Sequence, residues 1–235
     1  MDFFSWHTYT DDPYLYVRKA RAIRQWLDEH DFAQTKIHLN EWNYLPRNDW
    51  TPMLAQEDPK RRQLWFETIG GVEGAAFTAC VLAYFQDSPV DVANYYSGDV
   101  NPFGLFNRYG VPRKTYYAMD AFRRLLATPR RVQASGWRAG RTAVCAGIDT
   151  KGDRAGVLIS NLRGEESSFS LEISHLPWSG PTAWTTLVVD AERNLEPLAT
   201  GIHVTREVHL RQVLPAPGIL LFQPRPASDE ELHSR

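Results

Sequence analysis

The chain has 235 residues, 43% of them hydrophobic and 23% charged, which is ordinary for a globular protein of one large or two small domains. Its net charge of −2 gives no reason to expect nucleic acid or an anionic membrane as a partner. Two cysteines, Cys80 and Cys145, are too few for a disulfide framework, and each lies in an apolar run that predicts a buried thiol.

Up to Thr128, strand and helix patterns alternate along the chain. Strands are expected at residues 2–9, 36–41 and 90–96, and helices at residues 13–30, 60–86 and 113–126. The pair Gly70–Gly71 predicts a kink in the longest helix. Because each strand is followed by a helix, the strands are expected to run parallel in an α/β unit.

Beyond Pro129 the helical spacing disappears. Short β-branched runs such as "AGVLISNL" and "TAWTTLVVD" recur between turn residues, at the intervals of an antiparallel β-sandwich. The expected domains are the α/β unit at residues 1–128, an all-β sandwich at 129–224 and a disordered polar tail at 225–235. The tryptophans of the β region, Trp137, Trp178 and Trp184, are expected to pack the sandwich against its neighbour.

Polar and aromatic residues gather where each of the three expected parallel strands ends. The first strand end has Ser5, His7 and Tyr9, the second has Asn40, Glu41, Trp42 and Asn43, and the third has Asn94, Tyr95 and Tyr96. The carboxyl ends of parallel strands meet at one edge of a sheet, where functional groups collect. A carboxylate among amides and aromatic rings is the kind of setting that binds sugars. The histidines lack metal-ligand spacing, so neither a metal nor another cofactor is expected.

Three stretches carry a resemblance to a known group of enzymes. In order and spacing, "DFFSWHTY", "IHLNEWNY" and "VDVANYYSGD" with the following "GLFNRYGVPRKTYYAMDAFRRL" resemble the sixth, seventh and eighth strands of clan A glycoside hydrolases. The similarity is greatest to glycoside hydrolase family 39 (β-xylosidase-like), with family 51 (arabinofuranosidase-like) second, and covers roughly residues 1–127. It implies the C-terminal part of a (β/α)8 TIM barrel, strands six to eight, followed by the β-sandwich.

The Asn40–Glu41 pair has two possible places in that fold. In this clan an Asn-Glu pair more often marks the acid/base at the end of strand four, usually before a proline, whereas Trp42 follows here. Only one further strand and helix follow before the β region, so the resemblance places Glu41 at strand seven, as the catalytic nucleophile of a retaining glycosidase. It also implies substrate contacts from His7 and Tyr9, and from the group Asn40, Trp42, Asn43 and Tyr95.

The resemblance further implies that this chain is a C-terminal fragment. The acid/base belongs on strand four, which lies outside the sequence, so we expect the isolated chain not to hydrolyse its carbohydrate substrate. The natural N-terminus is then unknown, which leaves cellular location unassigned, although the first ten residues do not resemble a signal peptide. Oligomeric state is also unassigned.

Alternatives stay open at this point. The chain can be a non-catalytic carbohydrate-binding module, whereas a metal-dependent (β/α)8 hydrolase is disfavoured because no His-x-His motif occurs. Glu41 can instead be a structural carboxylate, His7 a buried histidine, and Trp42 a core residue.

Overall fold

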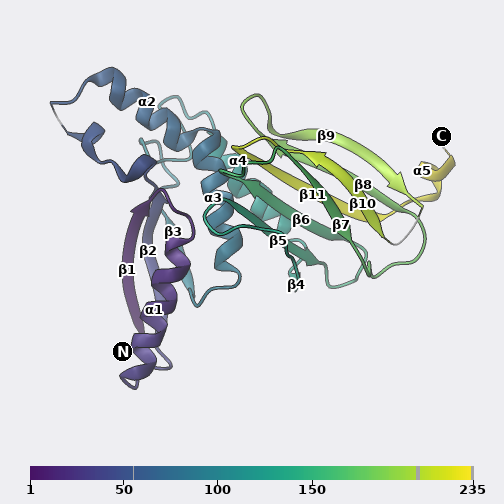
Figure 1. Cartoon of the computed structure of the whole chain (residues 1–235), viewed down its shortest axis with the longest axis horizontal. Helices are drawn as coiled ribbons and strands as arrows, with labels where there is room; N and C mark the ends of the chain where they lie inside the picture. The colour runs from purple at the N-terminus through teal and green to yellow at the C-terminus, as the bar shows by residue number, and fades with distance from the viewer. Residues whose placement is uncertain (55, 205–206, 234–235) are drawn as a thin grey trace.

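The computed structural model describes residues 1–54, 56–204 and 207–233, and it divides into a helix-containing part and a β-rich part (Figure 1). In the first part, three parallel strands form a sheet in the order β1-β2-β3, as expected. The strands are β1 (Phe3–Thr10), β2 (Lys36–Tyr44) and β3 (Val92–Tyr95), and the helices are α1 (Leu15–Glu29), α2 (Pro59–Gly70), α3 (Val72–Phe85) and α4 (Lys114–Leu125). Two 3-10 turns, η1 (Pro46–Asn48) and η2 (Thr51–Met53), lie between β2 and α2.

The long helix expected at residues 60–86 is two helices with a bend between them. Asp58 caps α2 by accepting a hydrogen bond from the Lys60 backbone N–H, and Pro59 occupies the first helical turn. The chain leaves helical geometry at Gly71, and α3 continues at an angle of 41° to α2. In the described part of the chain, no single helix is long and apolar enough to cross a membrane; the bent α2–α3 pair reaches that length and composition only together.

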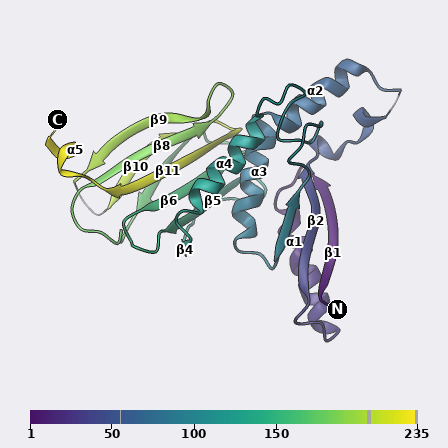
Figure 2. The same ribbon diagram turned by 180° about the vertical axis from the view of Figure 1, so that it is seen from behind.

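The β-rich part has a large and a small antiparallel sheet (Figure 2). The large sheet has the strand order β4-β5-β6-β11-β8-β9, and β10 pairs with β7 in the small one. The strands are β4 (Arg130–Val132), β5 (Thr142–Ile148), β6 (Ala155–Asn161), β7 (Ser168–Ile173), β8 (Thr182–Val189), β9 (Asn194–His203), β10 (Val208–Val213) and β11 (Gly218–Pro226). An α/β region followed by a β-rich region is thus confirmed.

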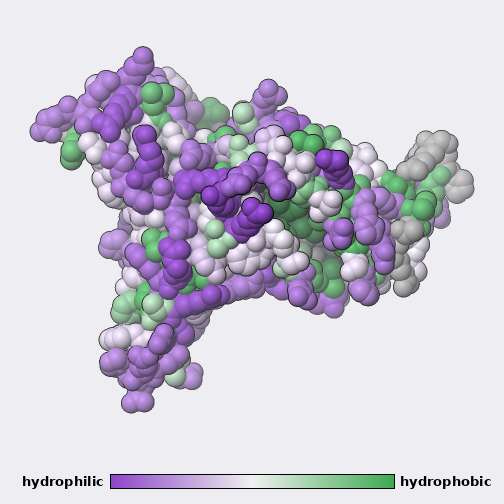
Figure 3. Space-filling view, in the orientation of Figure 1, coloured by the Kyte–Doolittle hydropathy of each residue, from purple (hydrophilic) through white to green (hydrophobic). Residues whose placement is uncertain are grey.

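The two β-sheets enclose an apolar cluster that contains Val157, Leu171, Leu220 and Phe222. Trp178 belongs to this cluster and Trp184 packs on it, so both rings pack inside the β-rich part and not, as expected, against its neighbour. Trp137 does contact the helical part, through Tyr14 and Tyr84. The small sheet does not cover the large one completely. A groove of about 540 Å³ opens between β5–β6 and the β7 region, and Figure 3 shows hydrophobic side chains within a hollow of the β-rich part.

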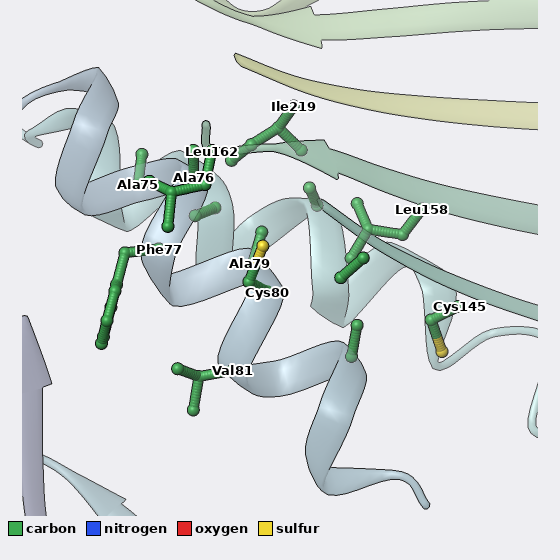
Figure 4. Packing of buried hydrophobic residues seen from close by; sticks show 14 of the residues in the cluster. Ala75, Ala76, Phe77, Ala79, Cys80, Val81, Cys145, Leu158, Leu162 and Ile219 are labelled. Atoms are coloured by element: carbon green, nitrogen blue, oxygen red, sulfur yellow. The ribbon is translucent and has the colours of Figure 1, made fainter. Parts of the chain in front are cut away.

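A second core joins the β-rich part to the helices. Ala76 and Cys80 of α3 are fully buried in one cluster with Leu158 of β6 and Ile219 of β11. Figure 4 shows these side chains between α3 and the large sheet, while Phe77 points to the opposite side of the helix. Cys145 is also buried there, and both thiols are free, as the sequence indicates. Helix α3 therefore lies between the parallel sheet and the large antiparallel sheet.

The prediction of a disordered tail from residue 225 is wrong for the residues described. Strand β11 pairs with β8 as far as Pro226, and a short helix, α5 (Asp229–His233), follows. Ser228 and Glu231 form a capping box: the Ser228 hydroxyl accepts from the Glu231 backbone N–H at 3.3 Å, and the Glu231 carboxylate accepts from the Ser228 backbone N–H at 2.9 Å. The sequence contains this Ser-x-x-Glu signal. Residues 234–235 lie outside the described residues.

The attachment of α5 is expected to depend on pH. The Arg225 guanidinium, with Nη2 2.5 Å from Glu231 Oε1, is the main cause that lowers the pKa of Glu231 from its ordinary 4.5 to about 2. A depressed folded-state pKa stabilises the docked helix above the ordinary pKa, and this contribution is lost as pH falls from 4.5 through about 2. An NMR titration should therefore show the Glu231 side chain and the Ser228 amide shifting near pH 2. A midpoint near 4.5 would contradict the ion pair, and Glu231→Gln should abolish the transition.

Candidate active site

An irregularity in β2 sets the direction of the Glu41 side chain. Trp6 pairs with Leu39 across β1 and β2, but the next residue, His7, pairs with Glu41, so Asn40 is the extra residue of a β-bulge. In a regular strand, residues three positions apart face opposite sides of the sheet. Leu39 and Trp42 are both buried against the helices, so the bulge between them shifts the alternation by one residue. Glu41 therefore faces the side of the sheet opposite α1 and α3. The strand also continues to Tyr44, so Glu41 lies within β2 and not at its end.

His7, Tyr9 and Glu41 share this outer face of the parallel sheet. The Tyr9 hydroxyl donates a hydrogen bond to Glu41 Oε1. His7 is exposed and lies beside Glu41 in the strand register. Burial, followed by the hydrogen bond and the charge of Glu41, raises the pKa of Tyr9 well above its usual range. The phenol thus remains protonated and serves as a fixed donor to the carboxylate.

Aromatic side chains surround the Tyr9 ring. Its centroid lies 5.2 Å from that of Trp50, 5.4 Å from Phe103 and 6.4 Å from Tyr96, in edge-on arrangements. Such geometry is favourable for aromatic pairs and fixes the ring beside Glu41. Sequence reasoning did not assign Trp50 or Phe103 to the site; the available signal was that both lie in loops that follow parallel strands. The peptide bond between Tyr96 and Ser97, directly after β3, is cis.

Trp42 and Tyr95 were expected to contact substrate, and the structure places both in the core. Trp42 is 1% exposed and packs edge-on against Tyr16 of α1 and Phe85 of α3. The Tyr95 ring lies 5.1 Å from the Trp42 ring, and burial raises the pKa of its hydroxyl. The bulge in β2 turns the Trp42 ring toward the helices, and the Tyr95 ring packs against it from β3, so neither presents a face to a ligand at Glu41.

The two asparagines of β2 differ in their surroundings. Asn43 is completely buried, and its amide donates to the backbone carbonyls of Tyr96 and Phe103, the latter at 2.9 Å. Its side chain therefore holds the loop after β3 in place, and the expected substrate contact from Asn43 is wrong. Asn40 is exposed at the bulge beside Glu41. In the part of the chain that the structure describes, no group of three or more His, Cys, Asp or Glu side chains is arranged to hold a metal ion.

Several solved glycoside hydrolases share this fold over part of their length, which agrees with the resemblance to clan A enzymes in the sequence. Among solved structures, a glucosidase from Croceicoccus marinus superimposes with a TM-score of 0.79 at 24% identity, over 97% of this chain and 54% of that one. A family 39 enzyme from Xanthomonas axonopodis pv. citri gives 0.71 at 14% identity, over 97% and 55%. An α-L-arabinofuranosidase from Thermotoga maritima gives 0.68 at 18% identity, over 96% and 53%.

The chain spans about half the length of these solved structures. No protein-family model matches the sequence, and no curated protein matches it.

Proposed function

We propose that this chain carries the nucleophile half of the active site of a retaining glycoside hydrolase that acts on β-xylosides or a related glycan. In this proposal, residues 1–128 are the last three strand–helix units of a (β/α)8 barrel, and residues 129–224 are its β-sandwich partner. The observation that carries the proposal is the hydrogen bond from Tyr9 to Glu41 on the sheet face away from the helices. In a complete barrel, that face would line the interior at its carboxyl end.

The chemistry requires a carboxylate that stays ionised and correctly aimed. Glu41 would attack the anomeric carbon as the glycosidic C–O bond breaks, and would form a glycosyl ester that water then hydrolyses. The Tyr9 hydroxyl donates to Glu41 Oε1 and so orients the carboxylate. The side chains of His7, which pairs with Glu41 across the strands, and of Asn40, which precedes it, are exposed and suited to bind sugar hydroxyls.

A second carboxylic acid must protonate the departing oxygen, at about 5–5.5 Å from the nucleophile in retaining enzymes. We propose that this acid lies on a strand of the barrel outside the chain. The chain alone would then lack turnover toward ordinary glycosides, while Glu41 would keep its reactivity toward substrates with a leaving group that needs no protonation.

Covalent trapping tests the assignment directly. The chain should be incubated with 2,4-dinitrophenyl 2-deoxy-2-fluoro glycosides of xylose, glucose and arabinose, whose leaving group departs unprotonated. Mass spectrometry is expected to find one glycosyl unit on the peptide that contains Glu41, and none in Glu41→Gln.

The matched control is Glu73→Gln, since Glu73 also accepts a tyrosine hydrogen bond, from Tyr44 at 2.5 Å. This variant should be labelled like the wild type. A label on another carboxylate, or no label with any of the three sugars, would remove Glu41 as the nucleophile.

The alternative of a non-catalytic carbohydrate-binding module has less support. Trp178 is 7% exposed, and Trp184 lies against Phe222 and His203 at ring distances of 5.8 Å and 6.4 Å. Trp137 contacts Tyr14 and Tyr84 of the helical part. Trp178 and Trp184 are engaged in packing, so they do not form an open platform for a sugar, and Trp137 is a single ring that is 38% exposed.

A further inference from the structure

Trp50 is a large aromatic side chain that remains 45% exposed beside the candidate site. It lies in the connection between η1 and η2. The segment that joins β2 to α2 runs beyond the ends of β1 and β2 (Figure 1). Its ring is edge-on to Tyr9 at 5.2 Å, and Tyr9 in turn donates to Glu41. One phenol ring therefore separates the indole from the carboxylate, a separation on the scale of a single sugar residue.

The backbone on both sides of Trp50 is fixed by hydrogen bonds. Asn48 accepts from the Asp11 backbone N–H at 3.0 Å and donates to the Asp11 carboxylate at 2.6 Å, which ties the connection to the end of β1. Asp49 accepts from the Thr51 backbone N–H at 2.8 Å and from Arg61 at 3.1 Å, which ties it to α2. An aromatic residue on an anchored backbone loses little conformational freedom when a ligand binds, so it is preorganised.

The indole is also held from one side by other rings. Phe103 lies at 6.0 Å and Trp65 at 6.4 Å, and both are almost completely buried. These contacts support one part of the Trp50 ring and leave the rest open to solvent. A flat, partly exposed ring with a fixed orientation can stack on the C–H face of a sugar.

We propose that Trp50 forms one wall of a second sugar-binding position that adjoins the position at Glu41. The ligand is an oligosaccharide of at least two linked rings, one at Glu41 and the next against Trp50. This inference rests on the proposed function, because Glu41 must hold the first ring. Trp50 thereby determines a preference for chains over single sugars.

Binding of sugars of different length tests the proposal. Titrations of the chain followed by NMR would compare methyl β-xyloside with β-1,4-xylotriose, and methyl β-glucoside with cellotriose. Trp50→Ala is expected to weaken trisaccharide binding about tenfold, the effect of roughly 1.4 kcal/mol of stacking, and to change methyl glycoside binding less than about twofold.

Trp26→Ala is the matched control. Trp26 is 46% exposed but lies on α1 against Phe4 and His30, so its replacement should change neither affinity. His7→Ala, beside Glu41, should weaken binding of both sugar lengths.

The outcomes separate this inference from the proposed function. If His7→Ala weakens binding and Trp50→Ala does not, the Glu41 site stands and the second position is refuted. Equal losses for both sugar lengths in Trp50→Ala would also refute it, because the ring would then act at the first position. If the wild-type chain binds none of the four sugars, both proposals fall.

Discussion

Replacing Trp42 with alanine is expected to destabilise the chain by about 3–5 kcal/mol, the usual cost of deleting a large aromatic side chain from a core. The indole is 1% exposed and lies between α1 and α3, with ring distances of 5.9 Å to Tyr16 and 5.7 Å to Phe85. Its loss would leave a cavity between the parallel sheet and both helices. Since domains of this kind are stable by only about 5–15 kcal/mol, the variant should be close to unfolding.

Urea denaturation followed by circular dichroism measures this effect. Trp50→Ala is the comparison, because that indole also lies near the sheet but is 45% exposed, and its cost should stay within about 1 kcal/mol. Equal stability losses for the two variants would contradict a core position for Trp42. A normal stability for Trp42→Ala would restore the sugar-platform interpretation.

Replacing Gly74 with alanine is expected to cost about 3 kcal/mol or more. A Cβ atom at Gly74 would lie 1.8 Å from the carbonyl oxygen of Ile69 and 2.7 Å from its carbonyl carbon. These are backbone atoms of α2, so the clash cannot be relieved by rotating a side chain. The bend between α2 and α3 would have to open. Because α3 packs on the large antiparallel sheet (Figure 4), such a change would disturb that core as well.

Gly98→Ala is the matched control, since a Cβ there would meet no atom within 4 Å. Its stability should change by less than about 0.5 kcal/mol. Thermal unfolding of both variants would show the difference as a large shift of Tm for one and almost none for the other. A Gly74→Ala variant as stable as the wild type would mean that the two helices can separate at their junction without cost.

The sequence predicts the order of elements well because hydrophobic periodicity and turn residues are local properties. It brings His7, Tyr9 and Glu41 to one place, since the ends of parallel strands are adjacent. The misplacement of Trp42 has a definite cause. Apolar residues occupy 37 and 39 and then 42 and 44, so the alternation slips by one residue, which is the mark of a bulge. An uninterrupted strand would have put Trp42 on the face opposite Leu39.

Other parts of the site depend on contacts that periodicity does not encode. Trp50 and Phe103 reach Tyr9 only because the connections after β2 and β3 fold back over the strand ends. The amide of Asn43 is used to hold one of these connections, and only the folded chain shows that its donors are occupied. The ordered tail, in contrast, was encoded locally, by Ser228 and Glu231.

The position of α3 between the parallel sheet and the large antiparallel sheet limits where the chain can be cut to join its parts to other proteins. A cut after residue 128 looks natural from the sequence, yet it would separate Cys80 from Leu158 and Ile219 through the centre of one core. The large sheet would lose the helix that covers one of its faces, and the helix would lose the sheet. A segment that is to be moved into another protein must therefore include α3 and α4 together with the β-rich part. It is longer than the all-β region alone.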